Sequence, residues 1–157
     1  MNILIIGGIA AGMSVAAKAK RENPEANITV VEKEDYISFG ACGLPYYLGE
    51  QFEDANIMFA RTPEQMEKSG IKILLQHEAI DIDFDAKKVR VKDLTHNGEE
   101  KTLSYDRLMI ATGASPNLPP MEGLDAKNLY LHTKLRDAES LKSNLHKYQH
   151  ITLIGGG

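Results

Sequence analysis

The only cysteine of this chain lies in a segment rich in glycine. Gly40 and Gly43 lie close to Cys42, so other groups can approach the sulfur closely. Pro45 suits the first turn of a helix, and a helix N-terminus beside a thiol lowers its pKa and favours the thiolate. The alternative is a structural cysteine, because cysteine is among the most buried residue types. The flanking residues favour a reactive thiol.

A glycine-rich turn near the N-terminus resembles a phosphate-binding pattern. Gly7 and Gly12 occupy the first and third glycine positions of G-x-G-x-x-G, and Ile9 occupies the second. The small residues between them let backbone N–H groups approach a pyrophosphate, and the following helix N-terminus adds partial positive charge. The turn consists of Gly7, Gly8, Ile9, Ala10, Ala11 and Gly12.

An acidic residue follows this turn at the distance that ribose recognition needs. Glu32 lies 20 residues beyond Gly12, at the end of a β-branched run, where a carboxylate accepts hydrogen bonds from ribose hydroxyls. The alternative is a glycine turn in an ordinary α/β protein. The strand before the turn, the helix after it and the acid together favour dinucleotide binding.

The elements that must position these residues follow from the hydrophobic pattern. Apolar runs at 3–6 and 28–31 flank an alanine-rich helix over 10–22, which makes a βαβ unit. Further helices are predicted over 45–48, 62–69 and 134–148. Further strands are predicted over 71–75, 78–84, 87–94, 101–104, 108–111 and 151–154, with a hairpin turn at Asn97-Gly98. The expected fold class is α/β, with a parallel sheet and an antiparallel β insertion.

The two ends of the chain share a pattern. Residues 3–8 and 151–156 both consist of an apolar run followed by glycines, but no helix follows the second run. A buried parallel strand without a crossover cannot complete its layer. We therefore expect a piece of a longer protein, cut within a second nucleotide-binding motif.

Composition excludes several function classes. Of 157 residues, 43% are hydrophobic and 25% are charged, which excludes a disordered or collagen-like chain. The net charge of −4 argues against nucleic acid as a partner, and one cysteine excludes an intramolecular disulfide. The N-terminal apolar run lacks a basic region and is too short to span a bilayer. We expect a cytoplasmic protein without a membrane partner.

Several motifs of this chain jointly resemble those of the pyridine nucleotide–disulfide oxidoreductases. They are residues 7–12, Glu32, residues 38–47, and residues 111–113 with Pro116. More narrowly, they are similar to the single-cysteine branch of coenzyme A disulfide reductases, NADH oxidases and NADH peroxidases. This resemblance implies a Rossmann-like FAD-binding domain over 1–113, an incomplete NAD(P)H-binding domain over 114–157, and a homodimer at full length.

The resemblance also implies roles for individual residues. It places the FAD pyrophosphate on residues 7–12 and the adenosine ribose on Glu32, with Lys33 beside it. It places the sulfur of Cys42 next to the isoalloxazine ring. Residues expected along the flavin nucleotide are Ala111, Thr112 and Gly113, and those expected to open the NADH motif are Gly155 and Gly157.

A single cysteine limits the redox chemistry. This chain cannot store electrons in an internal disulfide, so its oxidised form must be a mixed disulfide with a small thiol or a sulfenic acid. We expect NAD(P)H to reduce FAD, the flavin to reduce the oxidised sulfur, and the thiolate to attack the next substrate. The prediction is an FAD-dependent NAD(P)H-disulfide reductase, and the fragment alone is expected to be inactive.

Two details of the resemblance favour coenzyme A disulfide as the substrate. Oxidases and peroxidases of this branch carry a histidine in the glycine turn where this chain has Ala10, which removes an acid near a peroxide intermediate. Coenzyme A disulfide reductases place polar and basic residues of the first helix against the coenzyme A phosphates. Matching residues here are Ser14, Lys18 and Arg21, and Ser38 matches a further substrate contact.

Alternatives stay open. The basic residues of the first helix could be a solvated helix end that complements the dipole, and Ala41 stands where some coenzyme A disulfide reductases have asparagine. The whole protein could be an NADH oxidase or peroxidase, or a flavin-binding redox sensor that forms a sulfenic acid at Cys42. No metal site is expected, because Lys147 follows His146 where a zinc protease motif needs glutamate.

Overall fold

The computed structural model describes residues 1–95 and 97–155, which fall into two compact units. The first unit comprises Met1–Gly40 and Asn56–Gly113. The second comprises Ala41–Ala55 and the residues from Ala114 onward. The segment Ala41–Ala55 thus groups with the later part of the chain, and the domain boundary after Gly113 stays a prediction.

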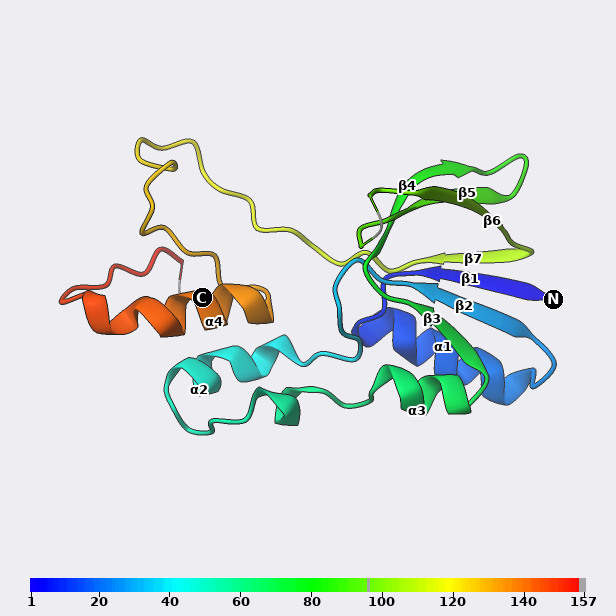
Figure 1. The fold of residues 1–157 in the computed structure, drawn as a ribbon, viewed down its shortest axis with the longest axis horizontal. Helices are drawn as coiled ribbons and strands as arrows, with labels where there is room; N and C mark the ends of the chain where they lie inside the picture. The colour runs from blue at the N-terminus through cyan, green and yellow to red at the C-terminus, as the bar shows by residue number, and fades with distance from the viewer. Residues whose placement is uncertain (96, 156–157) are drawn as a thin grey trace. The chain divides into compact units, whose positions relative to one another are not determined.

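A four-stranded parallel sheet forms the centre of the first unit (Figure 1). Its strands are, in spatial order, β3 (Ile71–Leu74), β2 (Asn27–Val31), β1 (Asn2–Ile6) and β7 (Arg107–Ile110). The pairing of β1 with β2 runs from Asn2 opposite Asn27 to Ile6 opposite Val31. Both strands therefore end at the same edge, beside the glycine turn.

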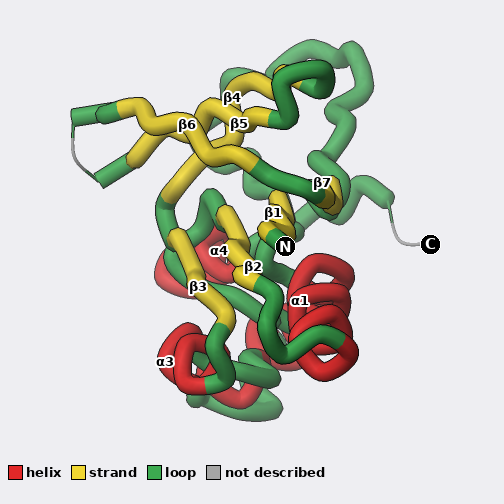
Figure 2. The backbone as a smooth tube through the Cα atoms, turned by 90° about the vertical axis from the view of Figure 1, so that its right-hand side faces the viewer, coloured by secondary structure: helices red, strands yellow, loops and turns green. Residues whose placement is uncertain are grey.

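Both faces of this sheet are covered, as an apolar parallel sheet requires. Helices α1 (Ala10–Glu22) and α3 (Pro63–Lys68) lie on one face (Figure 2), where Ile5 packs with Met13 and Met66. Strands β4 (His77–Asp83), β5 (Lys88–Asp93) and β6 (Glu100–Ser104) cover the other face. Successive residues of β1 thus serve opposite cores, because side chains alternate along a strand.

The antiparallel sheet consists of β4 (His77–Asp83), β5 (Lys88–Asp93) and β6 (Glu100–Ser104) in that order. Val89 and Val91 of β5 are fully buried and pack against Leu4 of the parallel sheet. Asn97 and Gly98 have φ values of 47° and 74° in the connection between β5 and β6. Positive φ at both positions is what a type I′ turn needs, and the predicted hairpin turn is confirmed.

Helix α3 begins at the predicted cap. The backbone N–H of Gln65 donates to Thr62 Oγ1 over 3.4 Å, and the backbone N–H of Thr62 donates to Gln65 Oε1 over 3.1 Å. This capping box satisfies donors that a helix otherwise leaves free. Pro63 occupies the first turn, where the missing N–H does no harm.

The regular elements found in the described part of the second unit are all helical. It contains a 3-10 helix (Ala41–Gly43), α2 (Leu44–Leu48), α4 (Leu135–Asn144) and a 3-10 helix (Leu145–Lys147). The predicted strand over 151–154 is wrong: these residues are irregular, and Leu153 is 80% exposed. A strand needs a hydrogen-bonded neighbour, and no strand lies among the described residues of this unit.

The predicted fold class is confirmed: the chain combines a parallel βαβ sheet with an antiparallel insertion. None of the helices in the described residues is both long enough and apolar enough to cross a bilayer.

Candidate functional site

Two glycines of the turn are required by sterics. Gly7 has φ of 102°, and a Cβ there would overlap the carbonyl oxygen of Ala111 at the end of β7. A Cβ on Gly12 would overlap the carbonyl oxygen of Gly7, because α1 approaches the turn closely. Ile9, at the second glycine position of the pattern, is the N-cap residue, and its φ of −92° is negative, so this position does not need the left-handed conformation that favours glycine.

The N-terminus of α1 has the features of an anion-binding end. The helix has 13 residues, and no side chain caps its first turn among the described residues. No acidic residue lies in that turn either. The first N–H groups of a helix have no partner within the helix, and the dipole favours negative charge there. A phosphate could therefore accept hydrogen bonds from the backbone at Ala10 and Ala11.

Glu32 is buried beside the same turn. Its side chain belongs to a residue that is only 5% exposed, at the end of β2. Its Oε2 accepts a hydrogen bond from the backbone N–H of Gly8 over 2.5 Å, and its Oε1 accepts one from Glu34 N over 2.8 Å. The structure thus brings together the turn and the acid that were predicted to form one dinucleotide site. Each carboxylate oxygen keeps a further lone pair for a ribose hydroxyl.

Gly8 allows this close approach. A Cβ on Gly8 would come within 3.1 Å of the Cβ of Glu32 and 3.0 Å of Ile37 Cγ2. Sequence analysis assigned Gly8 to the pyrophosphate turn and did not indicate its contact with Glu32 and Ile37. No local signal could have shown the contact, because Gly8 and Ile37 are far apart in the chain.

The other residues predicted to bind a cofactor differ from one another in their contacts. Lys33 is exposed, and its ammonium pairs with Glu78 Oε1 over 2.7 Å. Ala111 donates its N–H to Ile6 O over 2.7 Å, so the run Ala111-Thr112-Gly113 starts beside the glycine turn. Gly155 has φ of 86°, and Gly157 lies outside the described residues.

The predicted substrate residues of α1 lie on one exposed side of the helix. Ser14, Lys18 and Arg21 are exposed, whereas Met13 and Ala16 face the core. These three positions are four and three residues apart, so they form a stripe on the helix surface.

The polar groups of this helix differ in what they bind. Lys18 Nζ pairs with Glu22 Oε1 over 2.6 Å at an exposed position, and Ser14 Oγ donates to Ala10 O over 2.7 Å. Lys20 instead donates to Pro24 O and Ala26 O over 2.7 and 3.0 Å. Lys20 thus stabilises the turn that follows α1, and the substrate role of Ser14, Lys18 and Arg21 stays a prediction.

Cys42 is exposed, which rules out the buried structural cysteine for the described chain. It lies in the 3-10 helix that leads directly into α2, and Pro45 occupies the first turn of α2. Because Cys42 and the glycine turn belong to different compact units, the predicted approach of this sulfur to the flavin stays a prediction.

Sequence reasoning missed the residue that holds α2 within its unit. Lys142 of α4 donates from Nζ to Tyr47 O over 3.1 Å, and its ammonium lies 4.1 Å from the centroid of the Tyr47 ring. The carbonyl belongs to the C-terminal end of α2, where a cation is favourable. A contact between residues 95 positions apart leaves no local signal in the sequence.

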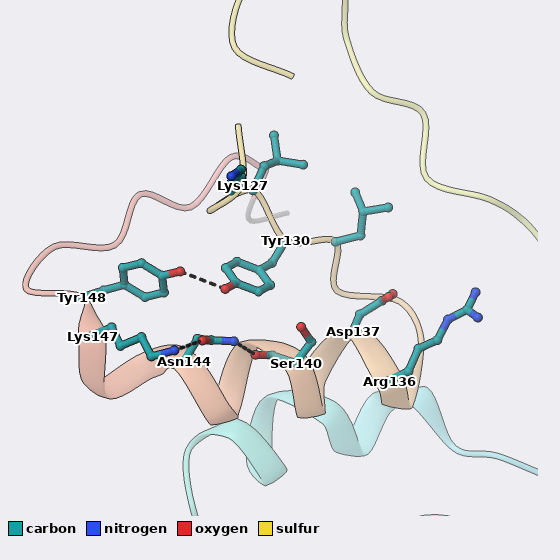
Figure 3. Close-up of a pocket in the computed structure, with 10 residues that line it drawn as sticks. Lys127, Tyr130, Arg136, Asp137, Ser140, Asn144, Lys147 and Tyr148 are labelled. Carbon is teal, nitrogen blue, oxygen red and sulfur yellow. Dashed lines mark hydrogen bonds between the residues drawn. The ribbon is translucent and has the colours of Figure 1, made fainter. Parts of the chain in front are cut away.

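A cavity of about 770 Å³ lies in the second unit (Figure 3). It is open and lined by α4 and the segment before it, and none of the predicted site residues contributes to it. Tyr130 and Tyr148 meet there through their hydroxyls over 2.8 Å. This hydrogen bond is the main reason that the pKa of Tyr130 is raised, and partial burial adds to the effect.

Possible metal ligands do not gather among the described residues: no group of three or more His, Cys, Asp or Glu side chains could hold an ion. His146 and His150 are both exposed.

Comparison with known proteins identifies several relatives. An NADH oxidase of Enterococcus faecalis is 32% identical over 157 residues, which cover 100% of this chain and 35% of that protein. An NAD(P)H coenzyme A polysulfide/persulfide reductase of Pyrococcus horikoshii is 34% identical, over 99% of this chain and 34% of that protein. A coenzyme A disulfide reductase of Staphylococcus aureus is 30% identical, over 99% and 35%. This chain thus spans about a third of the length of these relatives.

Solved structures share the fold. The water-forming NADH oxidase from Lactobacillus brevis bound to NADH superimposes with a TM-score of 0.89 at 33% identity, over 94% of this chain and 32% of that one. An NAD-dependent persulfide reductase from A. fulgidus gives a TM-score of 0.87 at 38% identity, over 94% and 27%.

The family profile described as pyridine nucleotide-disulphide oxidoreductase matches residues 1–157. The resemblance indicated by the sequence motifs is therefore confirmed, and the chain belongs to the pyridine nucleotide-disulphide oxidoreductase family.

Proposed function

We propose that this chain is the FAD-binding part of an NAD(P)H-dependent flavoprotein that reduces coenzyme A disulfide or a similar small disulfide. The observation that carries this proposal is that the only cysteine is exposed, in a chain that belongs to an oxidoreductase family. Relatives named coenzyme A disulfide reductase and coenzyme A polysulfide/persulfide reductase support the substrate class. We further propose a cytoplasmic homodimer for the complete protein.

The geometry of the glycine turn fits the adenosine diphosphate half of FAD. The first N–H groups of α1 would hold the pyrophosphate, and Glu32 would accept hydrogen bonds from the ribose hydroxyls. The hydrogen bond from Gly8 N–H to Glu32 Oε2 holds the acid beside the turn, which supports a site formed by the fold itself. Lys33 and residues 111–113 would lie along the rest of the nucleotide. FAD, when bound, supplies two-electron transfer between NAD(P)H and a sulfur.

Cys42 would carry the disulfide chemistry. Its thiolate attacks one sulfur of the substrate, a mixed disulfide forms, and one thiolate leaves. Two electrons that originate from NAD(P)H then break the mixed disulfide and release the second thiolate. In the balanced reaction, one disulfide, one NAD(P)H and one proton give two thiols and NAD(P)⁺.

Arg21 would contact the phosphates of coenzyme A. It is exposed on the same side of α1 as Ser14 and Lys18, and no ion pair of its side chain is found in the described part of the chain. Lys18 would exchange its exposed pair with Glu22 for a phosphate, at little cost because such surface pairs contribute about 0–1 kcal/mol.

The second candidate is an NADH oxidase, favoured by the relatives of that name from Enterococcus faecalis and Lactobacillus brevis. Ala10 in the turn argues against it, because the side chain cannot protonate an oxygen intermediate. Steady-state kinetics on the complete, FAD-loaded protein separates the candidates. Disulfide reduction should exceed oxygen consumption with NADH or NADPH as the donor, and the opposite ratio would make the protein an oxidase.

A further inference from the structure

The backbone of Gly8 in the glycine turn is held from two sides. Its N–H donates to Glu32 Oε2 over 2.5 Å, and its carbonyl oxygen accepts a hydrogen bond from the N–H of Ser38 over 2.9 Å. The peptide between Gly8 and Ile9 is trans, so its carbonyl and its N–H point in opposite directions. The bond from Ser38 therefore also fixes the direction of the Ile9 N–H, which has no hydrogen-bond partner among the described residues.

The segment that makes this bond has a backbone conformation that needs support. Ser38 has φ of 54° and stands between the buried residues Ile37 and Phe39. Left-handed backbone is costly for a residue with a Cβ and persists only where the surrounding structure determines it. The groups that pack against this segment therefore determine how it meets the glycine turn.

Residues 58–60 supply backbone support from the other side. The N–H of Ala60 donates to Ser38 O over 3.0 Å, and the N–H of Gly40 donates to Met58 O over 2.8 Å. Residues 36–40, residues 58–60 and the glycine turn all belong to the first compact unit. The chain of contacts from residues 58–60 to Gly8 thus lies within one unit.

Three aromatic rings join the same two segments. The ring centroids of Tyr36 and Phe39 are 5.1 Å apart, and Phe59 lies 5.4 and 5.5 Å from them. These separations are those of favourable aromatic pairs. Phe39 and Phe59 also form an isolated antiparallel bridge. Phe59 is therefore the residue of the second segment that contacts the first through both its ring and its backbone.

We propose that Phe59 is a positioning residue of the nucleotide turn: it holds residues 36–40, and these fix the peptide between Gly8 and Ile9. The inference rests on the proposed function, in which this turn binds the pyrophosphate of FAD. A donor whose direction is fixed by the fold loses little freedom when a ligand binds, so such a donor binds more tightly. Phe59 acts through other residues and needs no contact with the cofactor.

Titration of the complete protein, freed of cofactor, with FAD tests this role. Phe59→Leu removes the ring and keeps most of the apolar volume, and it should raise the Kd for FAD about tenfold. Phe59→Tyr keeps the ring and should stay within about threefold of wild type. Tyr105→Leu is the control for a general loss of stability, because Tyr105 is buried in the core between the two sheets. It should lower the free energy of unfolding and leave the Kd within about threefold.

A shorter ligand locates the effect. Adenosine diphosphate carries the pyrophosphate without the flavin, so Phe59→Leu should weaken its binding by the same factor as that of FAD. A loss for FAD with no loss for adenosine diphosphate would place the effect outside the turn and overturn the proposal. An equal rise of the Kd in Tyr105→Leu would also overturn it, since destabilisation alone would then explain the loss.

Amide hydrogen exchange tests the hold on the turn without any ligand. In Phe59→Leu, the amide of Ser38 should exchange about tenfold faster, while that of Val91 in β5 is unchanged. Faster exchange with normal FAD affinity, or lost affinity with unchanged exchange, would overturn the proposal. A wild-type protein that binds no FAD would refute the proposed function. Exchange at Ser38 would then still support the hold on the turn if it rises in Phe59→Leu, and overturn it if it does not.

A second variant covers the case in which Phe59→Leu does not fold. Ala60→Pro removes the N–H that donates to Ser38 O and leaves the three rings in place. Phe59 precedes this position in an extended bridge, a conformation that a following proline tolerates. The variant should speed exchange at Ser38 and raise the Kd for FAD, by smaller factors than Phe59→Leu. Wild-type values of both in Ala60→Pro would contradict the proposal.

Discussion

The glycine turn and the cysteine segment are built in opposite ways. Gly7 and Gly12 are confined by carbonyl oxygens, and Glu32 is 5% exposed with both carboxylate oxygens bonded to the backbone. Cys42 is exposed in a 3-10 helix, and the five-residue α2 that follows is held by Lys142. A site that binds a large cofactor needs a preformed cradle, whereas a nucleophile needs access to its substrate.

The largest effect is expected at the sulfur. Cys42→Ser in the complete protein should abolish disulfide reduction, because a serine hydroxyl cannot form the mixed disulfide. FAD content and the reduction of FAD by NADH should stay normal, since the glycine turn is unaffected. Turnover with coenzyme A disulfide and the visible spectrum measure the two properties. Retained disulfide reduction would mean that Cys42 is not the reacting residue.

Gly12→Ala should disrupt the glycine turn. The new methyl group overlaps the carbonyl oxygen of Gly7, so α1 must move away from β1. We expect a loss of about 3 kcal/mol or more in the free energy of unfolding, with loss of bound FAD. Gly123→Ala is the control without steric overlap: the positive φ of 83° makes a Cβ unfavourable there, but nothing lies within 4 Å of it, so a smaller loss is expected. Equal losses in the two variants, measured by urea denaturation, would show that steric overlap is not the cause.

Glu32→Gln tests the acid with little change in shape. A glutamine offers one oxygen to the two N–H groups of Gly8 and Glu34, so one buried donor loses its partner. We expect FAD affinity to fall about tenfold or more and the protein to lose about 1–3 kcal/mol of stability. Glu78→Gln, at an exposed ion pair with Lys33, is the control and should change stability by less than about 1 kcal/mol. Normal FAD affinity in Glu32→Gln would remove this residue from the site.

Arg21→Ala tests whether helix α1 contacts the phosphates of the substrate. We expect KM for coenzyme A disulfide to rise about tenfold, because a charge-assisted hydrogen bond to phosphate contributes about 1.5–3 kcal/mol. A small disulfide without phosphates should be unaffected. Lys20→Met is the control on the same helix, since Lys20 binds the carbonyls of Pro24 and Ala26 and should affect stability rather than KM. Equal effects on both substrates in steady-state kinetics would contradict the phosphate contact.

The smallest effect is expected at the tyrosine pair of the second unit. Tyr148→Phe removes the hydroxyl partner that raises the pKa of Tyr130, so this pKa should fall toward the value of about 10 that is usual for tyrosine. Since the folded-state pKa is raised, the stabilisation by this pair is present below about pH 10 and is lost as the pH rises through the folded pKa. Ultraviolet titration of tyrosinate measures the shift, and an unchanged pKa would show that the hydroxyl contact is not its cause.

The sequence by itself determined the parts of this molecule that depend on local rules. Glycine spacing and β-branched runs predicted the βαβ unit, Thr62 predicted the start of α3, and Asn97-Gly98 predicted the hairpin turn. Each of these signals acts within a few residues, because turns and caps depend on backbone angles and nearby donors.

Tertiary structure decided the contacts between segments that are distant in the chain. It placed Glu32 on Gly8, bonded Lys142 to Tyr47 and held Ser38 at positive φ. It also left the apolar run over 151–154 without strand structure. The physical reason is the same in each case: hydrogen-bond partners from other segments determine these conformations, and the local sequence does not specify which partners will be present.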